Sequence, residues 1–84
     1  MTERAIGKVT HYFDRIGAAA LELTDELSVG DTIHLKGHTT DFIQRVASIQ
    51  IEHQACEKVG PGNDIAIKVD ERVREGDTVY KVSE

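Results

Sequence analysis

The chain has 84 residues, of which 39% are hydrophobic and 30% are charged. A chain of this length buries about 60 to 65% of the surface that its unfolded form exposes, so we expect a single domain over residues 1–84. Ten Lys and Arg residues against fifteen Asp and Glu residues give a net charge of −5. This balance excludes indiscriminate phosphate binding through a basic arm, and any contact with nucleic acid must be local.

The cysteine content and the apolar runs predict a location. Cys56 is the single cysteine and cannot form an internal disulfide, whereas small domains of oxidising compartments usually carry several. The N-terminal residues contain no apolar region typical of a secretory signal. The longest apolar run, residues 16–21, is about a third of the ~20 residues that a membrane span needs. We therefore expect a cytoplasmic protein that has no membrane partner.

Apolar residues alternate with a period of two in most segments, and this pattern predicts strands. In residues 32–36, for example, Ile33 and Leu35 share one face, and residues 65–69 repeat the pattern. Glycines next to Asp or Asn mark the turns between these segments. The predicted strands, taken in chain order, are residues 4–13, 16–24, 31–36, 42–53, 54–58, 64–69 and 77–82. Their spacing is typical of an all-β sandwich or barrel.

Two segments are less regular than the others. Residues 18–27 also permit a helix, because Ala, Leu and Glu dominate and Leu23 and Leu27 stand four apart. We favour a strand there, since Gly17 and the alanines that follow it suit a strand at a bend. Residues 79–82 alternate less cleanly, as expected for a strand that closes a barrel or lies at an edge.

A short repeat opens two of the predicted strands. Gly30-Asp31-Thr32 and Gly76-Asp77-Thr78 have the same three residue types. Glycine supplies a positive φ, and an aspartate side chain accepts hydrogen bonds from nearby backbone N–H groups. The repeat therefore predicts two turns of the same kind and has no further functional meaning.

The residues needed for catalysis or metal binding are not arranged in any recognised pattern. Phosphate loops, dinucleotide fingerprints, nucleophile elbows and Cys-x-x-Cys pairs are all missing. Cys56 follows His53 by three residues, but on a strand such a pair would at best be neighbours along one edge, and we expect Cys56 to be a buried filler. His34, His38 and Asp41 surround one turn, although their spacing fits no zinc signature. We expect no enzyme activity, no metal and no cofactor.

Two arginines form a further candidate site for anions. Arg72 and Arg74 can grip a carboxylate or a phosphate with paired hydrogen bonds. Acidic residues surround them in the same run, and we expect the two arginines to form ion pairs with Asp70, Glu71 and Glu75.

Four stretches, in a fixed order, carry a resemblance to a known family. The first is a Gly-Asp turn leading into a strand that ends in Gly (residues 29–37), and the second is a Val-x-Ser-Ile strand (46–51). The third is a Gly-Pro-Gly-Asn-Asp turn (59–67), and the fourth is an Arg-Glu-Gly-Asp-Thr-Val strand start (73–79). With residues 6–13 they resemble the second domain of translational GTPases such as elongation factor Tu and initiation factor two. The resemblance covers nearly the whole chain, and it implies a closed six- or seven-stranded antiparallel β-barrel of the translation-factor domain-two type.

The same resemblance implies a non-catalytic binding module that contacts RNA or a ribonucleoprotein. The GTPase domain is missing, so no nucleotide hydrolysis is expected. A local cluster of basic side chains, His34, Lys36, His38 and Arg45, would form the binding face. The family's turn near the tRNA 3′ end reads differently here, as Pro61-Gly62-Asn63-Asp64, so a pocket for the terminal adenosine is not implied.

Two alternatives remain open. A similar barrel stands at the C-terminus of a collagenase-like peptidase family, many of whose members act in RNA modification, which implies a detached accessory barrel that binds a protein partner such as a peptidase or RNA-modification enzyme. Net acidity and the lack of a basic stripe favour this alternative. Residues 74–79 also resemble the Gly-Asp turn of biotin and lipoyl carrier domains, but no lysine has the flanking motif that such carriers need.

Overall fold

A computed structural model describes residues 2–52 and 54–83, which form β-strands and turns without a helix. The strands are β1 (Thr2–Phe13), β2 (Ala18–Leu23), β3 (Leu27–Ser28), β4 (Thr32–Lys36), β5 (Asp41–Arg45), β6 (Ile49–Ile51), β7 (Gln54–Cys56), β8 (Lys58–Val59), β9 (Asp64–Lys68) and β10 (Thr78–Ser83). The all-β prediction is confirmed, and residues 18–23 are a strand rather than a helix. Within the described ranges no helix is available to cross a membrane.

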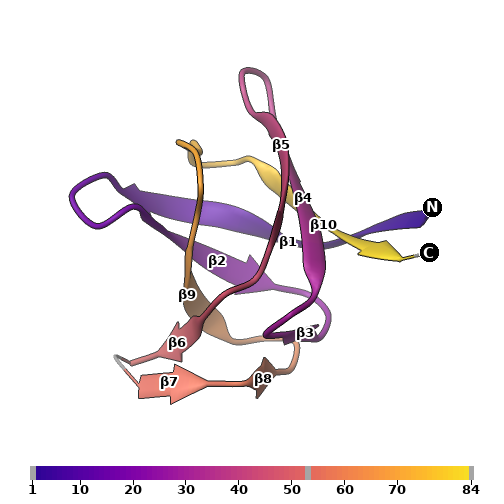
Figure 1. Ribbon diagram of the computed structural model, residues 1–84, viewed down its shortest axis with the longest axis vertical. Coiled ribbons are helices and arrows are strands. Elements are labelled where there is room, and N and C mark those ends of the chain that lie inside the picture. The colour runs from indigo at the N-terminus through magenta and orange to yellow at the C-terminus, as the bar shows by residue number, and fades with distance from the viewer. Residues whose placement is uncertain (1, 53, 84) are drawn as a thin grey trace.

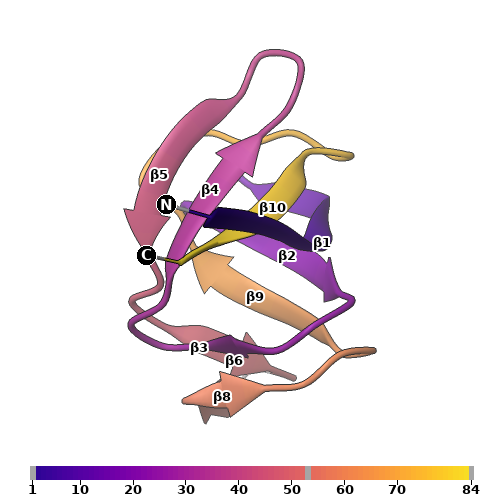
Figure 2. The same ribbon diagram turned by 90° about the vertical axis from the view of Figure 1, so that its right-hand side faces the viewer.

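Eight of the strands form one antiparallel sheet, which curls around the core (Figure 1). The strand order is β5-β4-β10-β1-β2-β9-β6-β7, and β3 pairs with β8 in a separate small sheet. The edge strands β5 and β7 each have one neighbour, so the described strands do not close into a barrel, and the prediction of a closed barrel is wrong. The sequence predicts that residues 79–82 close a barrel or lie at an edge, but β10 lies between β4 and β1 within the open sheet (Figure 2).

The sheet stays open because the chain leaves the β5 ladder after Arg45. The Val46 N–H donates to the Asp31 carbonyl at 2.8 Å, and the Val46 carbonyl accepts from the Gly30 N–H at 2.8 Å. These bonds tie Val46 to the turn before β4, and residues 46–48 then cross to β6, near the other edge of the sheet. The predicted strand 42–53 is therefore two strands. The predicted strand 54–58 is likewise divided into β7 and β8.

One side chain bridges the seam that the backbone leaves open between β5 and β9. The Gln44 Nε2 group donates to the Lys68 carbonyl at 2.8 Å, and its Oε1 atom accepts from the Asp70 N–H at 2.7 Å. Gln44 is only 6% exposed, so both bonds are shielded from water and are stronger than they would be on the surface. Its amide thus links the edge strand β5 to the end of β9, where the two strands form no ladder.

The core fills the inside of the curled sheet. Along each long strand alternate side chains are buried, because successive residues point to opposite faces. The predicted inward positions of residues 32–36 and 65–69 are confirmed. The core consists of Ile6, Val9, Ala19, Leu21, Leu23, Leu27, Ile33, Leu35, Val46, Ile49, Val59, Ile65, Ile67, Val69, Val73 and Val79.

The two Gly-Asp-Thr repeats form turns with matching hydrogen bonds, as predicted. Asp31 Oδ2 accepts from the Ser28 N–H at 2.9 Å, and Asp77 Oδ2 accepts from the Arg74 N–H at 2.8 Å. Each Asp N–H also donates to the carbonyl of the same partner residue at 3.1 Å. The glycine before each Asp has a φ of 95° or 90°, a conformation that favours glycine.

Candidate functional sites

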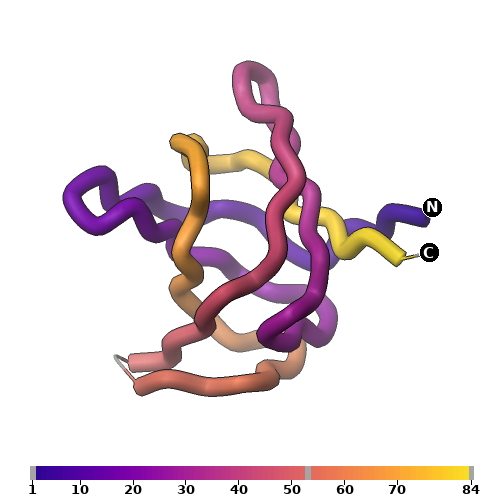
Figure 3. Tube along the Cα trace, viewed as in Figure 1, coloured from indigo at the N-terminus to yellow at the C-terminus, as the bar shows by residue number. Residues whose placement is uncertain are grey.

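The predicted basic cluster lies on β4, β5 and the loop between them. His34 and Lys36 are on β4, Arg45 ends β5, and His38 lies in the β4–β5 loop, which projects from the body of the molecule (Figure 3). Register pairs Lys36 with Asp41 and Arg45 with residue 32, so these two cations occupy the outer face at opposite ends of the ladder. The two ends of the ladder are four residues apart along each strand, a distance of about 13 Å.

His34 is held between two carboxylates that come from other strands. Its Nδ1 atom bonds the Glu3 Oε1 atom of β1 at 2.9 Å, and its Nε2 atom bonds Asp41 Oδ1 at the start of β5. The hydrogen bond to Asp41, and then the one to Glu3, raises the pKa of His34 above its ordinary 6.5. The same bond to His34 lowers the pKa of Asp41 below its ordinary 3.8. The two acids therefore stabilise the protonated form of His34 relative to a free histidine and lie beside the charge that it would carry.

This arrangement changes the electrostatics of the predicted binding face. The His34 side chain is 12% exposed, and two acids contact it. Asp41 also faces Lys36 across the ladder. The face is a mixture of signs rather than a cationic patch, and phosphate binding depends on net positive charge. The assignment of His34, Lys36, His38 and Arg45 to a binding surface stays a prediction.

The remaining sequence candidates are dispersed. In residues 2–52 and 54–83, no group of three His, Cys, Asp or Glu side chains could hold a metal ion. In the Glu3–His34–Asp41 cluster the two acids bond different ring nitrogens of His34. Cys56 is partly buried and packs against the core, while His53, its predicted neighbour, lies outside the described residues. The ion pairs found between described residues do not include Arg72 or Arg74, so the expected pairing with their acidic neighbours is not seen.

A groove on the outer face of β2 and β9 is a site that sequence reasoning missed. It has a volume of about 410 Å³. Register places Ala20 beside Ala66 and Ala66 beside Gln50, so small side chains form its floor. Phe13, at the end of β1, and Ile16, in the β1–β2 turn, border it and are 41% and 61% exposed.

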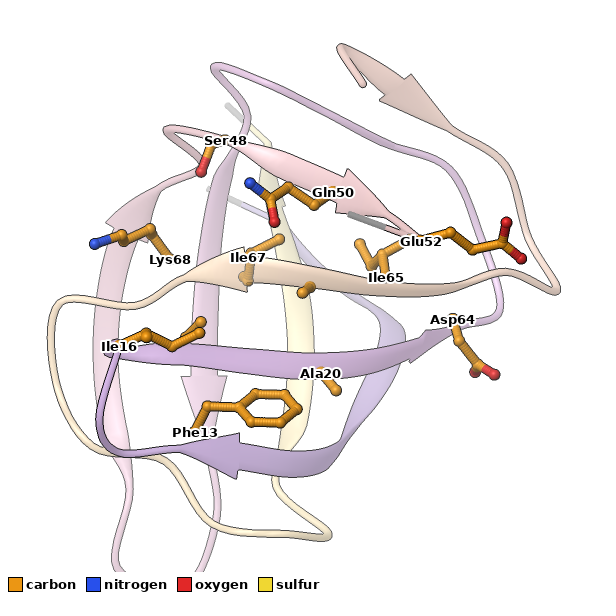
Figure 4. A pocket seen from close by; sticks show the side chains of 12 residues that line it. Phe13, Ile16, Ala20, Ser48, Gln50, Glu52, Asp64, Ile65, Ile67 and Lys68 are labelled. Carbon is orange, nitrogen blue, oxygen red and sulfur yellow. The ribbon is translucent and has the colours of Figure 1, made fainter. Parts of the chain in front are cut away.

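Charged residues mark the two ends of this groove (Figure 4). Lys68 lies at the same end as Ile16, while Asp64 and Glu52 lie at the other. The groove is therefore apolar along its length, basic at one end and acidic at the other. The sequence held one signal for it: residues 18 and 20 are alanines at the outward positions of a strand whose inward positions include Leu21 and Leu23.

Comparison with known proteins gives relatives of one kind. No protein-family model matches the sequence. The chain is 38% identical over 80 residues to an uncharacterized protease of Methanocaldococcus jannaschii, covering 94% of this chain and 20% of that protein. It is 42% identical over 78 residues to a collagenase of Porphyromonas gingivalis, covering 90% of this chain and 22% of that protein. The chain thus spans about a fifth of the length of these relatives.

The solved structures agree on the fold. The C-terminal domain of a Geobacillus thermoleovorans protein assigned to the U32 peptidases matches with a TM-score of 0.88 and 20% identity, over 93% of this chain and 91% of that domain. Its selenomethionine variant matches with a TM-score of 0.86 and 19% identity, over 90% of this chain and 96% of that one. At this level of identity the match establishes the fold alone.

These comparisons overturn the resemblance to translational GTPases. The similar proteins are named as proteases and collagenases, and the similar structures are a peptidase C-terminal domain. The Gly-Asp turns and strand starts that carried the resemblance are features of local turn chemistry, which unrelated β-folds share. The assignment to the translational GTPases is therefore wrong, and these comparisons give no support to RNA binding. The chain is similar in sequence to part of these proteases and collagenases, and similar in fold to the C-terminal domain of a U32 peptidase.

Proposed function

We propose that this chain is a non-catalytic accessory domain of the U32 peptidase type, which works by binding a protein, namely the catalytic part of such a peptidase. The observation that carries this proposal is the extent of the similarity. The matching region covers 90 to 94% of this chain but only about a fifth of the length of each relative, and these relatives are named as a protease and a collagenase. Most of each relative lies outside the matching region, and that is where we place the catalytic groups.

The surface of the domain supports a protein partner. Its net charge is −5, and the basic side chain of His34 is paired with acids. Exposed apolar side chains, Phe13 and Ile16, border a groove on one face. Apolar surface of this kind, rimmed by polar residues, is typical of protein interaction sites.

The test is a binding measurement with a relative as the partner. The M. jannaschii protease, prepared without its matching region, is titrated with this chain by calorimetry. We expect saturable binding of one copy to one copy. The matching region of the M. jannaschii protein, added as a separate chain, is the positive control. If that region binds and this chain does not, the proposal is wrong for this chain. If neither binds, the proposal that domains of this type dock onto the catalytic part is wrong.

The absence of catalysis is tested in the same preparation. We expect the isolated chain to leave unfolded protein substrates intact, because Cys56 is partly buried and directs its thiol at the Gln54 carbonyl, 3.7 Å away. Cleavage that follows the folded domain through purification would contradict the proposal, and Cys56→Ser would then show whether the thiol is responsible. The cytoplasmic location stays a prediction.

A further inference from the structure

The groove between Phe13 and Gln50 is a feature of the described surface that the fold itself does not explain. Single exposed apolar residues are ordinary on protein surfaces. Here two of them, Phe13 and Ile16, stand along one wall of a hollow whose floor is alanine. Small floor residues let another element approach the sheet closely, and the two apolar side chains then cover it.

The backbone around the groove limits what can occupy it. β2 is paired with β1 and with β9, and β9 is paired with β2 and with β6, so the strands beneath the groove have neighbours on both sides. An extended segment laid across this face would find no free backbone partners, and its own N–H and C=O groups would be buried against alanine and isoleucine at a cost. A helix satisfies its backbone groups internally and presents only side chains.

The charges at the ends of the groove favour one direction for such a helix. Lys68 stands at one end of β9, and Asp64 stands at the other with Glu52 beside the groove. A helix has a partial positive charge at its N-terminus and a partial negative charge at its C-terminus. The four strand steps between Asp64 and Lys68 cover about 13 Å, the length of roughly nine helical residues.

We propose that the groove receives one amphipathic helix of the protein partner, lying along β9 with its N-terminal end beside Asp64 and Glu52 and its C-terminal end beside Lys68. This inference rests on the proposed function, because it assigns the surface through which that partner docks. The apolar side of the helix fills the space over Ala20 and Ala66, against Phe13 and Ile16.

The first test compares two exposed isoleucines. Ile16 borders the groove, whereas Ile43, which is 51% exposed, lies on β5 away from it. In the calorimetric titration with the truncated M. jannaschii protease, we expect Ile16→Ser to weaken binding about five- to tenfold, as loss of an apolar anchor does. Ile43→Ser should leave the affinity unchanged. Equal effects of the two variants would overturn the inference.

The second test concerns direction and charge. Lys68→Glu should weaken binding about two- to fivefold at low salt, with a smaller effect at high salt. Lys8→Glu makes the same charge change on β1 outside the groove, and should have a clearly smaller effect. A Lys68→Glu variant that binds as well as the unchanged chain would contradict the proposed orientation.

The third test identifies the occupant. Hydrogen exchange of the truncated protease, with and without this chain, locates the protected segment, and a peptide of that segment is then titrated. We expect the peptide to gain helical circular dichroism on binding, and a proline at its centre to abolish binding. Binding without helix formation would overturn the inference.

Methyl NMR separates failure of this inference from failure of the proposed function. On titration with the truncated protease, the methyl signals of Ile16, Ala20 and Ala66 should shift while that of Ile43 stays in place. Binding with shifts elsewhere leaves the proposed function standing and overturns the groove as its site. No binding overturns both. If instead the chain self-associates and Ile16→Ser makes it monomeric, the occupant is a second copy and the helix assignment is wrong.

Discussion

At the scale of single residues, the Gly-Asp turns show how one side chain determines the identity of another. Asp77 is 5% exposed, and its carboxylate accepts a hydrogen bond from the Arg74 N–H. The same carboxylate lies against Gly37, where a Cβ atom would come within 1.9 Å of Asp77 Oδ1. The strand β4 is therefore followed by glycine because a side chain from a distant turn fills the space.

We predict that Gly37→Ala lowers the free energy of unfolding by about 1 to 3 kcal/mol, because the new methyl group displaces the buried carboxylate. Urea unfolding measures the change. Gly60→Ala is the matched control, since nothing lies within 4 Å of a Cβ atom there and its φ is not positive. In an Asp77→Ala background the cost of Gly37→Ala should fall, and an unchanged cost would show that the contact is not its cause.

His34 makes the stability of the domain depend on pH. Its pKa is raised by Asp41 and Glu3, so its contribution is fully present below its ordinary value of 6.5 and is lost as the pH rises through its higher folded value. The lowered pKa of Asp41 adds stability above 3.8, which is lost as the pH falls through its lower folded value. The cluster therefore contributes most between 3.8 and 6.5.

We predict that the difference in free energy of unfolding between the unchanged chain and His34→Gln is larger at about pH 5.5 than at about pH 9, because only the protonated imidazole pairs with both acids. Urea unfolding at the two pH values measures it. NMR titration gives a direct control: the pKa of His34 should lie above 6.5 and should move toward 6.5 in Asp41→Asn. A pKa at or below 6.5 in the unchanged chain would contradict the predicted pairing.

At the scale of elements, the edge strand β5 is where this fold departs from a barrel. Strand β5 has β4 as its ladder partner, and Gln44 supplies the connection to the segment after β9. An edge strand with unpaired backbone groups invites pairing with other chains. The buried amide fastens the C-terminal half of β5 to the body of the domain, while Ile43 beside it remains exposed.

We predict that Gln44→Ala destabilises the domain by about 1 to 3 kcal/mol, because the Lys68 carbonyl and the Asp70 N–H lose their partner in a buried setting. Gln54→Ala, at an exposed position of β7, is the control and should change stability by less than about 0.5 kcal/mol. Hydrogen exchange at the Asp70 amide measures the local effect. Protection there that survives Gln44→Ala would contradict the bridging role.

At the scale of the whole molecule, the ten strands share one core. A domain of this size has a free energy of unfolding of about 4 to 13 kcal/mol, at 0.05 to 0.15 kcal/mol per residue. Isoleucines occur both inside and outside the core, and Ile67 is 1% exposed whereas Ile43 is 51% exposed. The same substitution at the two positions therefore shows how much of the stability of the domain comes from side chains inside the curled sheet.

We predict that Ile67→Ala costs about 2 to 5 kcal/mol, which is a large share of the total, because a buried side chain is replaced by a cavity. Ile43→Ala should change the stability by less than about 0.5 kcal/mol. Thermal unfolding compares the two variants. Equal melting temperatures would mean that the inside of the sheet is not the core described above.

The amino-acid sequence by itself determined the all-β class, most of the strands with their inward faces, and the two Gly-Asp turns. Those features depend on residues that are close in the chain, such as Ile33 with Leu35 or Asp31 with Ser28. It also led to the wrong family, since the turn chemistry that carried the resemblance is shared by unrelated β-folds. The alternative that named a peptidase accessory domain agrees better with the relatives.

Only the tertiary structure decided the strand order, the open seam and the surfaces. The Glu3–His34–Asp41 cluster joins three strands, and the bonds of Gln44 join residues 24 and 26 positions away. The groove likewise combines Phe13, Ala20 and Ala66, which the register of β1, β2 and β9 brings together. Periodicity shows which face of a strand is buried, but not which strands become neighbours, because that depends on how the whole core is enclosed.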